Sequence, residues 1–172
     1  MRTLYLLRHA KSSWADFGLD DHDRPLNARG VESCTRLVPH LRQEGIAPDL
    51  VLCSTAERAR ATLHGIFPGL PAPLAVRFDP AVYLAAPGDL LALARATAAE
   101  VRRLMVIGHN PGLEDLARSL AGSGPPDALA RLEEKFPTGA LACFSFDIDT
   151  WQDLSPGTGR LCLFTLPRLL DA

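Results

Sequence analysis

The sequence has 172 residues, of which 47% are apolar and 22% are charged, proportions that are ordinary for a soluble globular protein. A chain of this length can bury roughly 70% of its unfolded surface, so we expect a single domain spanning residues 1–172. The formal net charge of −2 excludes a general electrostatic attraction to nucleic acid or to an anionic membrane, and any anion site must therefore be local.

Neither the cysteines nor the apolar stretches indicate export, metal binding or insertion into a membrane. Cys34, Cys53, Cys143 and Cys162 are widely spaced and form no CxxC pair, so we expect reduced residues of the core. Few apolar residues precede Arg8, and no later stretch approaches the roughly 18 uninterrupted apolar residues of a membrane span. We therefore expect a cytoplasmic protein without a cofactor or a metal.

The first predicted element is a short buried strand, Leu4–Leu7, which ends at two polar residues. Arg8 and His9 follow the apolar run directly, as happens when a buried strand delivers polar side chains to the edge of its sheet. A neutral imidazole can attack phosphorus, and a neighbouring guanidinium can donate two hydrogen bonds to phosphate oxygens. The pair therefore fits phosphoryl transfer, although an isolated Arg-His pair is more often a strand cap and a solvated charge.

A loop rich in titratable side chains, residues 15–25, connects this strand to the first predicted helix. Its simplest interpretation is a solvated acidic loop. Asn27 has the character of an N-cap and Gly45 that of a stop, so we expect a helix from Asn27 to about Glu44, bent at Pro39. Its buried face is expected to carry the apolar side chains of Val31, Cys34, Leu37, Val38 and Leu41.

The next unit is a strand, a turn and a helix. Asp49–Cys53 is an apolar run typical of a buried strand, and Ser54 with Glu57 forms a capping-box pattern that starts a helix at about Thr55. Arg58 lies close to the start of this helix, where its side chain can reach back over the end of the strand. Taken alone, Arg58 is more simply a surface charge of the helix.

The middle of the chain repeats the alternation of strand and helix. We expect a third strand at Leu74–Phe78, a helix from about Gly88 to Thr97, and a fourth buried strand at Leu104–Ile107. The last of these strands ends in GHNPG, where Asn110 can cap a helix. His109 then lies at a strand-to-helix turn, a position where a lone histidine more often makes a structural hydrogen bond.

The remaining elements are expected to complete the sheet. The helix that follows His109 breaks at Gly122–Pro126, and a short helix covers Asp127–Lys135. Ala140–Phe146 and Arg160–Leu166 are two further strands, whose spacing is typical of a hairpin or a sheet edge.

Three of the predicted strands end close to residues that can bind phosphate. Strands that alternate with helices favour a three-layer α/β/α sandwich with a mostly parallel central sheet. The carboxyl ends of parallel strands share one edge of such a sheet, and ligands bind there. We therefore expect Arg8, His9, Arg58 and His109 to meet in one crevice.

Four motifs occur along the chain in this order: LLRHAKSSW, RPLNARG, CSTAERARAT and VIGHNPG. Together they resemble the histidine phosphatase superfamily, whose fold is phosphoglycerate mutase-like, and in particular its SixA-type phosphohistidine phosphatases. The carboxyl-terminal segment Trp151–Phe164 also resembles that branch. The resemblance therefore covers most of the chain.

The resemblance implies a role for each residue of the expected crevice. His9 is the phosphorylated nucleophile, and Arg8 and Arg58 bind the phosphoryl group. His109 donates to that group in the transition state. Arg24, which lies in RPLNARG, matches a further arginine that contacts phosphate.

Two departures concern the branch of the family and the proton donor. Ala10 follows His9 where the common signature has glycine, a change that resembles the SixA-type branch rather than the mutases. The sequence has no match to the glutamate that serves mutase-like members as general acid, and Asn110 stands where acid-phosphatase-like members carry aspartate. A phosphohistidine leaving group needs less help from a strong acid. The remaining candidates for the donor are Asp16, Asp20, Asp23 and Glu114.

The sequence therefore predicts a metal-independent phosphatase that acts through a covalent phosphohistidine on His9. We favour a phosphoprotein substrate, because a chain of this length leaves little material for the insertions that enclose a sugar phosphate. A small-molecule phosphomonoesterase or mutase on the same scaffold is the second hypothesis. The third is a phosphate-binding module without turnover, which needs the arginines but has no need of a histidine placed for attack.

The arginines also predict the protonation of the two histidines. Guanidinium groups close to His9 disfavour a further positive charge and should depress its pKa below the ordinary value of about 6.5. His109 experiences the same field when the site is empty. A bound phosphate dianion reverses the local sign, so we expect it to raise the pKa of His109.

Overall fold

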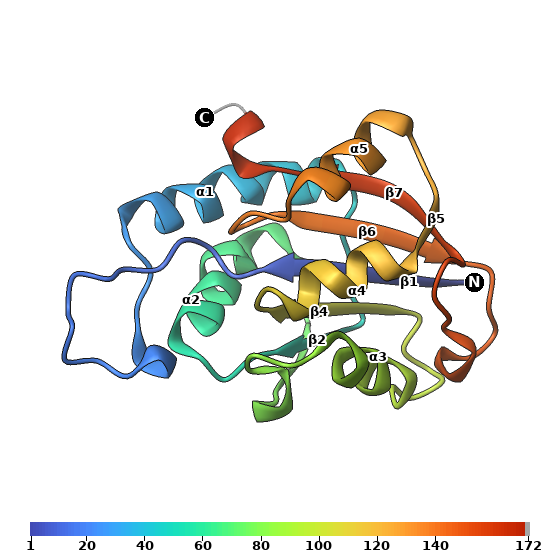
Figure 1. The fold of residues 1–172 in the computed structure, drawn as a ribbon, viewed down its shortest axis with the longest axis horizontal. Helices are drawn as coiled ribbons and strands as arrows, with labels where there is room; N and C mark the ends of the chain where they lie inside the picture. The colour runs from blue at the N-terminus through green and yellow to red at the C-terminus, as the bar shows by residue number, and fades with distance from the viewer. Residues whose placement is uncertain (171–172) are drawn as a thin grey trace.

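The structure, a computed structural model, describes residues 1–170 and contains a seven-stranded sheet between two layers of helices (Figure 1). The strands follow the order β3-β2-β4-β1-β6-β7-β5 across the sheet, so β1 is its central strand. Their bounds are β1 (Arg2–Arg8), β2 (Leu50–Cys53), β3 (Ala75–Phe78), β4 (Arg103–Gly108), β5 (Ala121–Ser123), β6 (Leu141–Phe146) and β7 (Gly159–Thr165).

The sheet is mixed, and four of its six neighbouring strand pairs are parallel. Strands β1 to β4 form the parallel half, while β6 runs antiparallel to both β1 and β7. The predicted pair of carboxyl-terminal strands is confirmed as an antiparallel pair. The sequence analysis missed β5, which pairs with β7 beside it, because three residues are too few to show an alternating pattern.

Helices α1 (Ala28–Gln43) and α2 (Glu57–Ile66) pack on one face of the sheet. Helices α3 (Pro87–Arg95), α4 (Gly112–Leu120) and α5 (Pro126–Glu134) pack on the other. Alternate residues of β1 point to opposite faces, so Leu4 and Leu6 enter one half of the core and Tyr5 and Leu7 the other. The three-layer α/β/α prediction is confirmed.

The prediction for α1 is correct in its start and partly wrong in its buried face. Asn27 caps the helix by accepting a hydrogen bond from the Gly30 amide at 2.9 Å. Cys34 is buried, as are the two leucines one and two turns further on, but Val31 is 57% exposed. At about 100° per residue, Val31 lies roughly 90° around the helix from the centre of that buried face. Pro39 lies inside α1 without ending it.

Two predicted helix caps are wrong. Helix α2 begins at Glu57 and has Ala56 at its N-cap, so Ser54 does not form a capping box. Helix α4 begins one residue after Pro111, and the Asn110 side chain donates instead to Glu114 and to the Phe136 carbonyl. Both polar side chains therefore make contacts at the edge of the sheet in place of the predicted caps.

The cysteines are not all core residues. Cys34 and Cys53 are buried, Cys143 is half-buried, and Cys162 is exposed on β7. The prediction is therefore wrong for Cys162, whose side chain alternates to the outer side of its strand. Among residues 1–170, no helix has both the length and the apolar content that a bilayer span requires.

Candidate active site

The register of the three parallel strands brings their carboxyl ends together. Arg8 pairs with Gly108 across β1 and β4, and Cys53 pairs with Ile107 across β2 and β4. The next residue of each strand continues this ladder: the His9 amide donates to the Gly108 carbonyl, and the Ser54 amide donates to the Ile107 carbonyl, both at 3.0 Å. The residues that follow the strands therefore surround one point at the edge of the sheet.

A pocket of about 310 Å³ lies at this edge. All five residues that the sequence analysis proposed for the site line it: Arg8, His9, Arg24, Arg58 and His109. Arg58 comes from the first turn of α2, and Arg24 comes from the loop before α1. Seven further residues complete the lining: Lys11, Ser12, Trp14, Asp21, Leu84, Asn110 and Thr138.

The imidazole of His9 is held in an orientation that leaves one nitrogen available. Its Nδ1 lies 2.7 Å from the Ala10 carbonyl, an oxygen that can only accept, so the ring proton resides on Nδ1. Nε2 then carries the lone pair, and the Arg58 Nε donates to it at 3.4 Å. Burial lowers the pKa of His9 to about 4, and Arg58, Arg8 and Arg24 act in the same direction. The neutral imidazole that the sequence analysis expected at position 9 is therefore the main form at pH 7.

His109 lies beside His9, with 5.0 Å between the two ring centroids. Its Nε2 lies 2.7 Å from the hydroxyl of Ser54, and both side chains are buried. The Ser54 hydroxyl can donate its proton to Nε2 while its oxygen accepts the Ala56 amide at 3.2 Å. In that tautomer the ring proton of His109 is on Nδ1. Burial lowers the pKa of His109 to about 3, and the neighbouring His9 and Arg58 add to the effect.

Asp21, which the sequence analysis did not single out, connects the arginines of the pocket. One carboxylate oxygen accepts from Arg24 at 2.8 Å, and the other accepts from Arg58 at 2.9 Å. The Tyr83 hydroxyl donates to the second oxygen at 2.6 Å. The bonds from Tyr83 and then Arg58 hold the pKa of Asp21 down at about 2. The only signal in the sequence is its place three residues before Arg24, at one end of a single helical turn.

Three buried polar atoms have no hydrogen-bond partner among the residues that the structure describes, and all three belong to residues that line this pocket. They are the Nε of Arg8, the Nδ1 of His109 and the Oδ1 of Asn110. Buried polar groups are nearly always paired, and unpaired ones require a physical reason. The Arg8 Nε–H, and the His109 Nδ1–H in the tautomer described above, are donors that a bound anion could occupy.

None of the four candidate proton donors lines the pocket. Asp16, Asp20 and Asp23 are exposed on the preceding loop. Glu114 is held by Arg118 at 2.7 Å and by the Phe136 amide at 3.0 Å, so it supports the fold around the site. Asp21 is ionised at neutral pH, because its pKa lies at about 2, and it cannot donate a proton there.

Comparisons with known proteins give consistent similarities. A family model described as "Histidine phosphatase superfamily (branch 1)" matches residues 4–118. An uncharacterised protein of Mycobacterium tuberculosis, Rv1276c, is 42% identical over 164 residues, which cover 94% of this chain and 100% of that protein.

Two solved structures of candidate phosphohistidine phosphatases SixA superimpose closely on this chain. The Agrobacterium tumefaciens protein is 32% identical, with a TM-score of 0.81 and coverage of 96% of this chain and 98% of that one. The Nakamurella protein is 30% identical, with a TM-score of 0.80 and coverage of 96% of both chains.

Proposed function

The chain belongs to the histidine phosphatase superfamily (branch 1), and we propose that it hydrolyses a phosphoprotein through a covalent phosphohistidine formed on His9. The observation that carries this proposal is the state of the His9 ring. Its Nδ1 is bound to a carbonyl, its Nε2 carries the lone pair and has a long 3.4 Å contact with the Arg58 Nε, and its pKa is well below neutrality. A ring prepared in this way can attack phosphorus without first losing a proton.

In the first step, the lone pair of His9 Nε2 forms a bond to phosphorus while the bond from phosphorus to the leaving group breaks. The pair of electrons in that bond leaves with the departing group. Arg8, Arg24 and Arg58 compensate the negative charge on the phosphoryl oxygens, and His109 donates a hydrogen bond from Nδ1. In the second step, water attacks the phosphorus, the N–P bond breaks, and inorganic phosphate leaves with His9 restored.

Asp21, the carboxyl group in the pocket lining, has a pKa of about 2 and is ionised at neutral pH, which favours a leaving group that needs little protonation. An alkoxide leaves poorly without a general acid. The imidazole of a phosphohistidine has a nitrogen that can be protonated by solvent before it leaves. The chemistry of the pocket therefore supports phosphohistidine as the substrate more than a sugar phosphate.

The rim of the pocket favours a protein over a small metabolite. Trp14 lies on the rim with 68% of its surface exposed, stacked 3.3 Å above the guanidinium carbon of Arg24. Phe17, three residues further along the same loop, is 94% exposed. Exposed aromatic side chains beside a site are typical of surfaces that bind another protein. Hydrolysis of a small phosphorylated metabolite is the second candidate function, because the pocket itself accepts any phosphoryl group.

Labelling tests the covalent intermediate and separates catalysis from simple phosphate binding. We expect brief incubation with phosphoramidate, followed by denaturation at alkaline pH, to leave a phosphoryl group on His9 that is detectable by mass spectrometry. Phosphohistidine peptides should then be hydrolysed faster than a panel of sugar phosphates and nucleotides, with and without a chelator. Absence of any histidine label together with background hydrolysis would favour a binding module, and a clear preference for one metabolite would reverse the choice of substrate.

The lowered pKa of His9 predicts activity in mild acid. Its neutral form is the reactive one, so lowering the pKa from 6.5 to about 4 moves the acidic limb of kcat/KM to about pH 4. A profile measured with a phosphohistidine peptide, corrected for the titration of the substrate, checks this value. An acidic limb at pH 6 to 7 that belongs to the enzyme would contradict the assignment.

A pH titration of the enzyme, followed by NMR, distinguishes the two histidines. With the site empty, both rings should remain neutral down to about pH 5, because their pKa values lie at about 4 and about 3. Inorganic phosphate should raise the pKa of His109, since a neighbouring dianion favours the imidazolium. If phosphate binds without an upward shift at His109, that residue does not face the phosphoryl group.

A further inference from the structure

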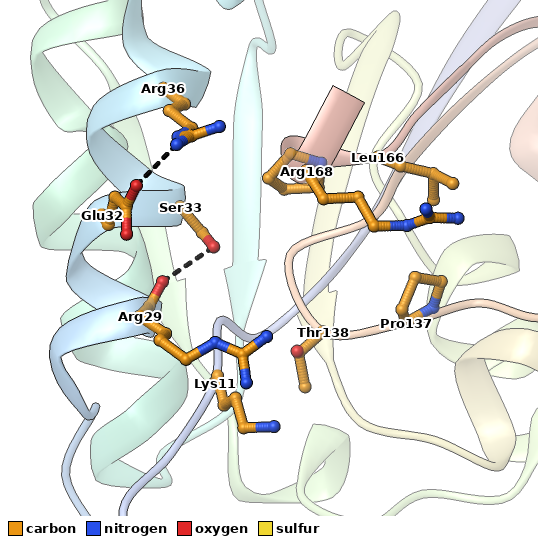
Figure 2. Close-up of a pocket in the computed structure, with 10 residues that line it drawn as sticks. Lys11, Arg29, Glu32, Ser33, Arg36, Pro137, Thr138, Leu166 and Arg168 are labelled. Carbon is orange, nitrogen blue, oxygen red and sulfur yellow. Dashed lines mark hydrogen bonds and ion pairs between the residues drawn. The ribbon is translucent and has the colours of Figure 1, made fainter. Parts of the chain in front are cut away.

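A second pocket, of about 380 Å³, lies next to the catalytic pocket. One of its walls is α1, and the other consists of residues 137–138 and 166–168 (Figure 2). Lys11 and Thr138 line both pockets, so the two are adjacent. In Figure 2, the ends of Lys11 and Arg29 point from one wall toward Thr138 on the other.

The lining of this second pocket is strongly basic. It contains Lys11, Arg29, Arg36 and Arg168 and a single carboxylate, that of Glu32. Arg36 pairs with Glu32 at 2.6 Å, while the other three cations form no ion pair with any residue within 1–170. This local excess of positive charge contrasts with the formal net charge of −2 on the whole chain.

Close backbone contacts hold both walls of the basic pocket against the end of β1 and the residues that follow it. A Cβ at Gly30 would lie 2.2 Å from the Lys11 carbonyl oxygen, so only glycine lets α1 approach so closely. On the opposite wall, Gly139 has φ +77° and its amide donates to the Arg8 carbonyl at 3.1 Å. The positions of both walls are therefore set by the strand end that carries Arg8 and His9.

We propose that this basic pocket binds acidic side chains of the polypeptide that presents its phosphoryl group to His9. The inference rests on the proposed function. It specifies acidic residues close to the phosphohistidine as the feature of the substrate that the enzyme selects. Lys11, Arg29 and Arg168, which form no ion pair within residues 1–170, are exposed on long side chains, an arrangement that fits several solvated carboxylates of an extended segment. Pro137, Leu166 and Pro167 line the same pocket and add apolar surface to it.

Phosphohistidine peptides of equal length test the proposal, with glutamate in one series and alanine in the other at the positions around the phosphohistidine. Wild-type enzyme should show a kcat/KM about 10-fold or more in favour of the acidic peptide, because two or three exposed ion pairs contribute. The difference should lie in KM and shrink as salt is added. The double variant Arg29→Glu/Arg168→Glu should abolish the preference for the acidic peptide. Its hydrolysis of the alanine peptide and of an aryl phosphate should be unchanged.

The control is Arg131→Glu/Arg160→Glu, which makes the same change in net charge at two exposed positions outside both pockets. This control variant should retain the preference for the acidic peptide. Equal KM values for the two peptides in wild type, or an equal loss in the control, would overturn the proposal. If wild type hydrolyses no phosphohistidine peptide, the proposed function has failed. Calorimetric binding of the unphosphorylated acidic peptide, present in wild type and lost in Arg29→Glu/Arg168→Glu, then decides whether the pocket binds acidic segments.

Discussion

Replacing His9 with alanine should lower hydrolysis by on the order of 10⁴-fold or more, the range found when an enzyme loses its nucleophile. No other group with a free lone pair and a lowered pKa occupies its place, because the Nε2 of His109 is bound to Ser54 at 2.7 Å. The loss should appear in kcat for a phosphohistidine peptide and for an aryl phosphate alike. The phosphoryl label on the protein should disappear with it.

The matched control is His64→Ala, an exposed histidine in the last turn of α2. It should keep wild-type rates, and thermal unfolding should show that His9→Ala is folded. Inorganic phosphate should still bind to His9→Ala, since the three arginines of the pocket remain. A His9→Ala protein that is folded and retains more than a few per cent of the wild-type rate would overturn the covalent mechanism.

The residues that the sequence identified are those that are fixed by strand ends. Arg8, His9 and His109 follow apolar runs whose parallel pairing places their ends at one edge, and this pairing follows from the alternation of strands and helices. Arg58 was accessible to the same reasoning because it lies in the first helical turn after β2. Local pattern and simple topology are sufficient for these four residues.

The residues that the sequence missed depend on contacts between distant segments. Asp21 is bound by Tyr83, which is 62 positions away in the chain, and the single 3₁₀ turn that contains Asp21 is too short to show a periodic pattern. Ser54 was assigned to a helix cap because local capping patterns carry no information on His109, which lies 55 positions away. Side-chain pairing between loops is decided by tertiary packing, and no spacing in the chain encodes it.

The basic pocket illustrates the same limit. Its cations come from the loop after β1, from α1 and from the residues after β7, and only the folded chain brings them together. Each one, taken alone, is a surface charge of ordinary appearance. The net charge of −2 correctly indicated that an anion site must be local but could not give its position.

Arg58→Ala should lower kcat/KM by about 10²- to 10³-fold, equivalent to about 3 to 4 kcal/mol of transition-state stabilisation. Arg58 is only 3% exposed and lines the pocket, where its Nε donates to the His9 Nε2 and a terminal nitrogen of its guanidinium donates to Asp21. Arg58→Lys should recover only part of the loss, since an ammonium keeps the charge but cannot donate two parallel hydrogen bonds.

The pH profile separates this role from a structural one. Arg58 contributes to the lowered pKa of His9, so its removal should raise that pKa and move the acidic limb of kcat/KM to higher pH. Arg60→Ala is the matched control on the same helix, because Arg60 is exposed and lies over the ring of Phe78 at 5.6 Å, away from the pocket. Arg60→Ala should change neither kcat/KM nor the pH of its acidic limb. If Arg58→Ala lowers the rate but leaves the acidic limb in place, the guanidinium acts on the phosphoryl group alone and not on the nucleophile.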